Sequence, residues 1–202
     1  MRINTFTCDY PCTDVNTRMI FPQPDLDLRK IRIVMISECP PAEREDYFYG
    51  TSNGAFFQTT RMAFSDAGAA IETYDDLTRM GIYLTTAIKC GKTGYLVSAK
   101  TIKECAVRFL KPELEQFPHV GMILCMGDFA IKAVNYVYKE KYGKSPIPPG
   151  STYKIRSQEY IQNGIRFLPS YTHTGDSFNI EKVKRQMIAE DIRTALEYLE
   201  SQ

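Results

Sequence analysis

Three short apolar runs, each followed by a segment with helical spacing, constrain the fold of this chain most. Residues 31–36, 81–88 and 120–126 are mostly apolar and contain several β-branched residues, as buried strands do. Apolar residues three to four positions apart predict helices in the segments that follow. These predicted helices cover residues 56–67, 101–117, 129–142 and 180–199. Strands that alternate with helices pair in parallel, with helices on both faces of the sheet.

A hairpin signal predicts one more strand near the C-terminus. Asn163-Gly164, the strongest short signal for a two-residue turn, separates residues 151–156 from residues 165–168. We therefore expect an α/β fold: three layers, α/β/α, around a central, mainly parallel four-stranded sheet. The length of 202 residues predicts one domain over residues 1–202, with a cysteine-bearing arm at residues 1–30.

Composition limits the classes of partner. Lys and Arg number 25 and Asp and Glu number 24, so the net charge of +1 gives no general attraction to nucleic acid. Any DNA contact must come from local basic patches. Apolar runs of membrane-spanning or signal-peptide type are absent from the sequence, which predicts a cytoplasmic protein that does not bind membranes. Because cytoplasmic thiols stay reduced, six cysteines favour metal or redox chemistry over disulfides.

Four of the cysteines have a spacing that suits a metal centre. Three residues separate Cys8 from Cys12, and fourteen separate Cys90 from Cys105. Four thiolates hold either an iron–sulfur cluster or a zinc ion. Zinc sites more often use two short pairs, so the long second spacing favours a cluster. The alternative is that these are ordinary packed thiols, which is our interpretation of Cys125 in a predicted buried strand.

Polar residues follow the predicted strands at the edge where parallel sheets bind ligands. Glu38 and Cys39 lie in the turn at residues 37–41, Ser-Glu-Cys-Pro-Pro. A carboxylate there positions a water or stabilises positive charge, or else it caps backbone N–H groups. Cys39 either lines a pocket or packs against the core. A glycine-flanked basic loop at residues 89–94 and a polar loop at residues 169–175 complete this edge.

Six motifs in this chain occur in an order that is characteristic of one protein family. They are residues 37–41, 48–50 (Phe-Tyr-Gly), 85–90 (Thr-Thr-Ala-Ile-Lys-Cys), 105–114 (Cys-Ala-Val-Arg-Phe-Leu-Lys-Pro-Glu-Leu), 126–130 (Met-Gly-Asp-Phe-Ala) and 169–174 (Pro-Ser-Tyr-Thr-His-Thr). Their order, with the cysteine spacing, resembles the uracil-DNA glycosylase superfamily, most closely its iron–sulfur, family 4-like branch. The resemblance extends from Cys8 to the last predicted helix.

The resemblance implies an enzyme that flips a modified base out of DNA and hydrolyses its N-glycosidic bond. Glu38 would place the attacking water, and His173 would stabilise negative charge on the leaving base. Cys39, Phe48 and Thr86 would form the base pocket, with Phe48 stacked on the base. A 4Fe-4S cluster would have a structural role. Its ligands would be Cys8, Cys12, Cys90 and Cys105.

The implied partner is DNA, single-stranded or containing uracil, bound by a monomer. The predicted DNA contacts are Lys89, Lys92, Ser170, Thr172 and Thr174. Thr86 and Thr172 replace the base-reading Asn and the loop His of the family. A hydroxyl lacks the paired donor and acceptor of an amide. The sequence therefore leaves two alternatives to a glycosylase: a nucleic-acid-binding iron–sulfur protein of the same fold, and an enzyme acting on nucleotides or other small molecules.

Overall fold

A five-stranded sheet lies at the centre of the computed structural model, which describes residues 7–22, 24–175 and 177–201. Its strand order is β3-β2-β5-β7-β6. The first four pair in parallel and β6 pairs antiparallel to β7. The strands are β2 (Ile33–Ser37), β3 (Ile82–Thr86), β5 (Met122–Met126), β6 (Tyr160–Gln162) and β7 (Ile165–Ser170). The mainly parallel α/β sheet is confirmed, and β6 corrects the predicted number of strands from four to five.

The hairpin between β6 and β7 turns at the predicted dipeptide. Asn163 and Gly164 have φ angles of 53° and 76°, the left-handed values that a type I′ turn requires. The first hairpin strand was predicted at residues 151–156, and this was wrong. Those residues contain helix α6 (Thr152–Ile155). A two-residue turn pairs only the residues that flank it directly, which are Gln162 and Ile165.

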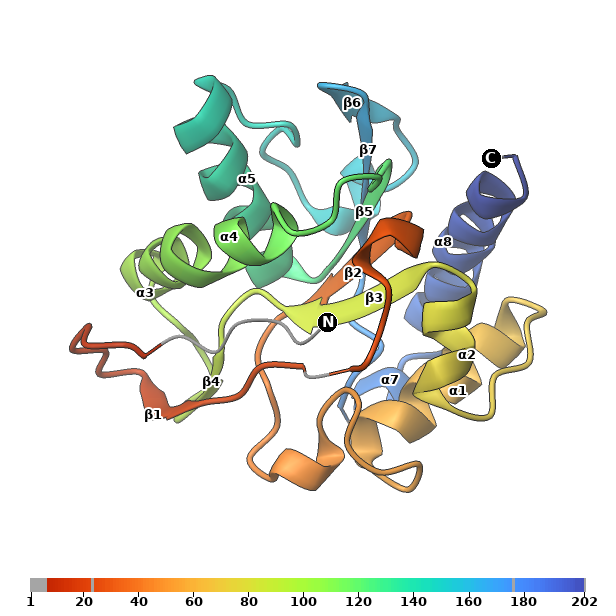
Figure 1. Ribbon diagram of the computed structural model, residues 1–202, viewed down its shortest axis with the longest axis horizontal. Coiled ribbons are helices and arrows are strands. Elements are labelled where there is room, and N and C mark those ends of the chain that lie inside the picture. The colour runs from red at the N-terminus through yellow and green to blue at the C-terminus, as the bar shows by residue number, and fades with distance from the viewer. Residues whose placement is uncertain (1–6, 23, 176, 202) are drawn as a thin grey trace.

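Helices cover both faces of the sheet, which confirms the three layers (Figure 1). Alternate strand residues belong to two separate cores: Ile36 and Cys125 to one, Met35 and Leu124 to the other. The first core includes α3 (Ala99–Cys105), a π-helical segment (Ala106–Leu110), α4 (Lys111–Leu114) and α5 (Asp128–Tyr142). The second includes α1 (Ala55–Asp66), α2 (Tyr74–Arg79), α7 (Ser177–Ile180) and α8 (Lys182–Glu200).

The predicted helix over residues 101–117 is not a regular α-helix. It starts after Ser98, whose Oγ accepts a hydrogen bond from the Thr101 N–H at 3.2 Å. About two turns later the π-helical segment Ala106–Leu110 follows Cys105 directly. π-helical turns often occur at functional sites. Here the segment lies between Cys105 and the buried Glu113.

The N-terminal arm is more regular than its sequence indicates. Strand β1 (Val15–Met19) pairs antiparallel with β4 (Cys90–Lys92), which follows β3. The backbone N–H of Ile20 also donates to the carbonyl oxygen of Lys89 at 2.7 Å. These bonds hold the arm beside β4, which starts at Cys90.

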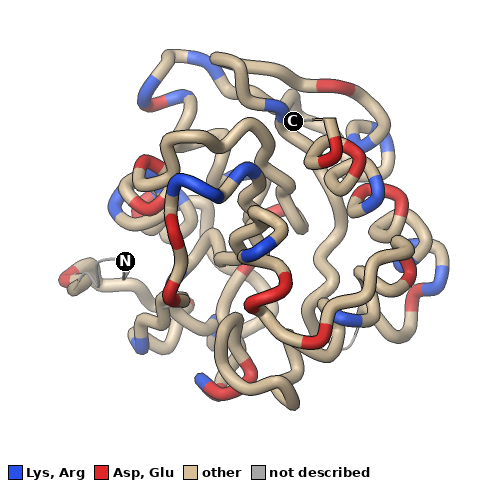
Figure 2. Tube along the Cα trace, turned by 45° about the vertical axis from the view of Figure 1, so that its right-hand side comes forward, with Lys and Arg blue, Asp and Glu red and all other residues tan. Residues whose placement is uncertain are grey.

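The carboxyl ends of four strands define one edge of the sheet, called the carboxyl edge below. Ser37 pairs with Thr86, and Met126 pairs with Ser170, at the last residues of β2, β3, β5 and β7. The loops that follow these four residues therefore all start at the carboxyl edge. Among the described helices, none has the length and apolar character needed to span a membrane. In Figure 2, acidic and basic residues are interspersed over the described part of the chain.

Candidate functional site

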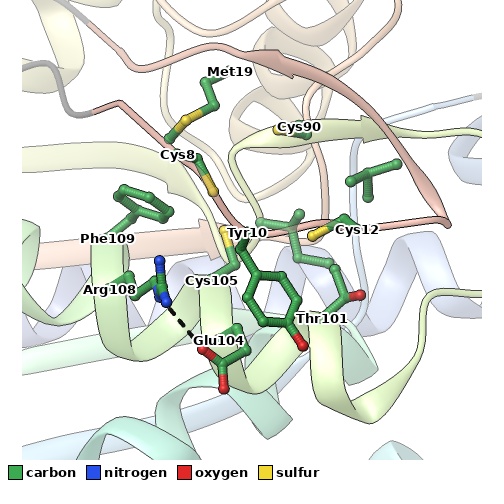
Figure 3. Close-up of a pocket in the computed structure, with 12 residues that line it drawn as sticks. Cys8, Tyr10, Cys12, Met19, Cys90, Thr101, Glu104, Cys105, Arg108 and Phe109 are labelled. Carbon is green, nitrogen blue, oxygen red and sulfur yellow. Dashed lines mark ion pairs between the residues drawn. The ribbon is translucent and has the colours of Figure 1, made fainter.

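Four cysteines surround one pocket at the junction of the arm, β4 and α3 (Figure 3). Cys8 and Cys12 come from the arm, Cys90 from the start of β4 and Cys105 from the end of α3. The structure therefore brings together the four residues that the sequence singled out. Cys125 is fully buried within β5 instead, as predicted for a core residue.

The four thiols influence one another electrostatically. Burial raises the pKa of Cys90 to about 12 and that of Cys105 to about 11, and neighbouring cysteines push both pKa values in the same direction. The backbone N–H of Lys89 opposes this by donating to the Cys105 sulfur at 3.3 Å. A bound cationic centre would instead lower the pKa values of these cysteines, since metal binding releases the thiol protons. Within the described residues, no three His, Cys, Asp or Glu side chains are arranged to hold a single metal ion.

Glu38 lies at the carboxyl edge between β2 and the start of α5. Its Oε1 accepts a hydrogen bond from the Phe129 N–H at 3.3 Å. Gly127, with φ of 100°, leaves the necessary room, because a Cβ there would lie 2.6 Å from Oε1. Burial raises the pKa of Glu38, although Phe129 and Lys92 oppose the shift. A carboxylate with a raised pKa at this edge is suited to accept a proton from water.

Three hydroxyl groups lie together at the carboxyl edge, and we call them the hydroxyl cluster: Ser37, Thr172 and Thr174. Ser37 Oγ lies 2.8 Å from Thr174 Oγ1 and 3.3 Å from Thr172 Oγ1. The two threonine oxygens are 2.9 Å apart. The cluster joins the end of β2 to the loop after β7. The predicted DNA contacts Thr172 and Thr174 are thus half-buried and bonded within the protein.

His173 does not lie where a catalytic role requires it. Its side chain is 1% exposed, and Nε2 lies 3.0 Å from Thr60 Oγ1 in α1. Since the Thr60 hydroxyl donates to the Phe56 carbonyl at 2.6 Å, Nε2 carries the proton and Nδ1 is a buried acceptor without a partner. Burial lowers the pKa of His173 to about 4. The predicted contact with a leaving base is therefore corrected: the neutral ring faces α1.

The predicted base pocket is closed by aromatic side chains. Phe48 is 2% exposed, and its ring packs against Tyr47, Phe56 and Tyr74 at centroid distances of 5.1 to 6.3 Å. A stacked base needs a free ring face, so the predicted stacking role of Phe48 is not supported. Thr86 is fully buried, and its Oγ1 lies 2.8 Å from Tyr47 Oη. No sequence signal pointed to Tyr47 as the partner of Thr86.

Lys89 was predicted to contact DNA phosphate, and this was wrong. It is fully buried, and its Nζ lies 2.5 Å from Glu113 Oε2. The ammonium also donates to Thr85 Oγ1 and to the Thr86 carbonyl, while Glu113 accepts from Tyr83 and Thr85. A buried charge needs a paired partner of this kind. Glu113 had a sequence signal, since it lies in the motif that starts at Cys105.

Three other predicted site residues differ in exposure. Ser170 is 1% exposed and donates to Asp191 Oδ2 at 2.6 Å, so the predicted DNA contact is corrected. Cys39 is buried in the core on the α3–α5 face, where burial raises its pKa to about 12. Lys92 is exposed at the end of β4, and its role in DNA binding stays a prediction.

Fold and site together define a class: an α/β protein with a carboxylate at the carboxyl edge of a parallel sheet and a four-cysteine pocket beside it. The family model of the uracil DNA glycosylase superfamily matches residues 24–199. The chain therefore belongs to the uracil DNA glycosylase superfamily, which confirms the superfamily that the motifs indicated.

Individual relatives are distant. The chain is 24% identical over 182 residues to the type-5 uracil-DNA glycosylase of Thermus thermophilus, covering 86% of this chain and 78% of that protein. Among solved structures, it is similar to wild-type UNG from Nitratifractor salsuginis, with a TM-score of 0.40 and 11% identity. That similarity covers 82% of this chain and 74% of the other.

Proposed function

We propose that this protein is a DNA N-glycosylase that hydrolyses the bond between deoxyribose and uracil or another modified base. The observation that carries the proposal is Glu38, a half-buried carboxylate at the carboxyl edge of a chain that belongs to the uracil DNA glycosylase superfamily. The relative from Thermus thermophilus, a type-5 uracil-DNA glycosylase, supports the same activity.

In the proposed reaction, Glu38 orients a water molecule toward the sugar carbon that carries the base. The water oxygen bonds to this carbon as the C–N bond breaks, and the base leaves with the bonding electrons. Glu38 takes up the proton that the water loses, which its raised pKa favours. The Phe129 N–H holds the carboxylate in place at the start of α5.

The leaving base acquires negative charge, which nearby hydrogen-bond donors stabilise. The imidazole of His173 is directed at Thr60, so it does not provide this donor. The hydroxyl cluster at Ser37, Thr172 and Thr174 lies at the same edge of the sheet, and Ser37 directly precedes Glu38 in the chain. In this proposal its hydroxyls take the part that an imidazole would otherwise play.

We propose that the four-cysteine pocket holds an iron–sulfur cluster as a structural group. Each thiolate of a 4Fe-4S cluster binds a different iron, so its ligands surround a space and need not meet at one point. Cys8, Cys12, Cys90 and Cys105 line one pocket, which supports this proposal, and they would be the ligands. When bound, the cluster would supply a covalent tie between the arm, β4 and α3, close to the carboxyl edge.

A second candidate function is DNA binding without hydrolysis. It is favoured by the closed base pocket, in which Thr86 is bonded to Tyr47 and the ring of Phe48 is covered. Mobility shift of labelled DNA without release of any base would select this function.

The glycosylase proposal is tested with labelled oligonucleotides that contain uracil or hypoxanthine. The wild-type protein should release the base, and Glu38→Gln should slow release by about 10²- to 10⁴-fold, because the amide cannot accept the proton. The matched control is Glu43→Gln in the same loop, where the side chain is exposed. Release at equal rates by Glu38→Gln and the control would exclude Glu38 as the catalytic group. Failure of the wild-type protein to release either base would refute the glycosylase proposal for these substrates.

A further inference from the structure

One residue joins four parts of the chain that meet between the cysteine pocket and the carboxyl edge. This residue is Lys89, which lies between the end of β3 and the start of β4. Its backbone N–H donates to Cys105 Sγ at 3.3 Å, and its carbonyl oxygen accepts from the Ile20 N–H of the arm at 2.7 Å. Its ammonium lies 2.5 Å from Glu113 Oε2 of α4 and donates to the Thr86 carbonyl of β3 at 2.7 Å. The position of Lys89 is therefore fixed from α3, the arm, α4 and β3.

Residues 87–89 form a short segment, called the connector below, between the turn of Glu38 and the cysteine pocket. The N–H of Ile88 donates to the Glu38 carbonyl at 3.0 Å, and the N–H before it donates to the Ser37 carbonyl at 2.8 Å. The next N–H, that of Lys89, is bonded to the pocket. All three residues are buried. Three consecutive amides thus link the backbone of Glu38 to a cysteine of the pocket.

The charge of Lys89 is not what packing alone would select. Taking an ammonium and a carboxylate out of water can cost more than their attraction returns, and apolar residues of similar volume often serve a core equally well. The pair at Lys89 also has defined directions. Glu113 accepts from the hydroxyls of Tyr83 and Thr85, and the ammonium donates to Thr85 Oγ1. So many directed contacts fix the geometry of the side chain, which apolar packing would not do.

The position of the connector bears on the proposed reaction because it supports Glu38. The carboxylate of Glu38 is held by the Phe129 N–H at the start of α5, and the backbone of Glu38 is held by the connector. A displacement of about 1 Å in a group that aligns the reacting atoms can slow a reaction by about 10²-fold. A residue that fixes the connector can therefore affect the reaction rate although it is itself fully buried.

We infer that Lys89 is a positioning residue, which through the connector fixes the turn of Glu38 relative to the cysteine pocket. The inference rests on the proposed function and deepens it, since it gives a buried residue a part in the reaction. Lys89 acts through the backbone of Glu38 and is not itself a catalytic residue. An iron–sulfur cluster bound to Cys105 would hold the other end of the connector.

The test removes the buried pair without leaving a stranded charge. Lys89→Met/Glu113→Gln takes away the ammonium and keeps an amide oxygen that can accept from Tyr83. This double variant should lower kcat for uracil release from labelled DNA by about tenfold to 10²-fold and change KM less than about twofold, because it displaces a group that acts on water. The matched control is Ile82→Ala, which opens a cavity in the core at the opposite end of β3. Equal kcat values in the double variant and the control would overturn the inference.

A milder variant covers the case in which the double variant does not fold. Thr85→Val keeps the volume of the side chain but removes the hydroxyl that contacts both Lys89 and Glu113. It should lower kcat by about threefold, with KM again nearly unchanged. An unchanged kcat in Thr85→Val would count against Lys89 as a positioning residue.

Hydrogen exchange separates this inference from the proposed function, because it needs no hydrolysis. The amides of Ala87 and Ile88 are bonded to the carbonyls of Ser37 and Glu38, so their exchange rates report how firmly the connector holds the turn. At equal free energies of unfolding, both amides should exchange about tenfold faster in the double variant than in the control. Equal exchange would overturn the inference even where kcat falls. Faster exchange in the double variant, with no base release by the wild-type protein, would support the position assigned to Lys89 while refuting the glycosylase.

Discussion

The cysteine pocket and the carboxyl edge lie beside each other, yet sequence motifs described them very differently. At the pocket, Cys8, Cys12, Cys90 and Cys105 come together from the arm, β4 and α3 as their spacing indicated. At the edge, Lys89 and His173 are in the expected loops and Ser170 ends β7, but all three side chains turn into the core. A motif located each loop correctly in both regions. It determined the side-chain direction in only one of them.

The difference lies in what each side chain can bond to within the protein. A thiol finds few strong partners in a core, so four thiols at one pocket stay available to an outside group. An ammonium, hydroxyl or imidazole group forms a hydrogen bond or an ion pair with an internal partner when one is close. Glu113, Asp191 and Thr60 provide those partners at the carboxyl edge. Three predictions test this contrast.

The largest effect is expected from removing a cysteine of the pocket. Cys90→Ala or Cys105→Ala should abolish the brown colour of anaerobically purified protein and reduce bound iron from about four atoms per chain to near zero. Cys125→Ala, in the core of β5, should keep both. Iron content and visible absorbance are the measurements. Equal iron in the Cys105 and Cys125 variants would contradict the assignment of the pocket.

A large loss of stability is expected from Lys89→Met. The change leaves Glu113 as a buried charge without its partner, which should lower the free energy of unfolding by about 3 to 5 kcal/mol. Lys132→Met removes an exposed lysine from α5 and should cost less than about 0.5 kcal/mol.

Denaturant unfolding of the same preparations measures both changes. The double variant Lys89→Met/Glu113→Gln should be more stable than Lys89→Met alone, because it removes the stranded charge. If Lys89→Met costs no more than Lys132→Met, the buried ion pair is not a structural element.

A smaller effect, confined to acid pH, is expected from His173. Its pKa falls from the usual 6.5 to about 4 on folding, so the unfolded chain binds a proton that the folded protein excludes between these values. Stability is therefore full above pH 6.5 and decreases as the pH falls toward 4, by roughly 3 kcal/mol at most. The measurement is the free energy of unfolding at pH 7 and at pH 4.5.

Variants isolate the contribution of this one ring. His173→Gln should lose less stability than the wild-type protein between the two pH values, since it has no proton to bind. His119→Gln replaces the other histidine, which is exposed, and should decrease in stability as the wild type does. Identical pH dependence in all three proteins would show that the His173 ring is open to solvent.

Hydrophobic periodicity was enough to predict three of the parallel strands and the layers of helices around them. The runs at residues 31–36, 81–88 and 120–126 became β2, β3 and β5, and the Asn163-Gly164 turn joined β6 to β7. The period of side-chain burial is a local property, so it can be found without knowledge of the fold. Strand β1 had no such signal, because its residues pair with β4 across more than 70 positions of sequence.

The sequence alone determined the parallel sheet, the position of its carboxyl edge and the four cysteines that gather beside it. Only the tertiary structure decided which polar side chains of that edge face outward. Glu38 remains half-buried because Gly127 leaves room for its carboxylate, whereas Lys89 and His173 are drawn inward by Glu113 and Thr60. The physical reason is that a buried polar group requires a partner, and partners distant in sequence become neighbours only in the folded chain.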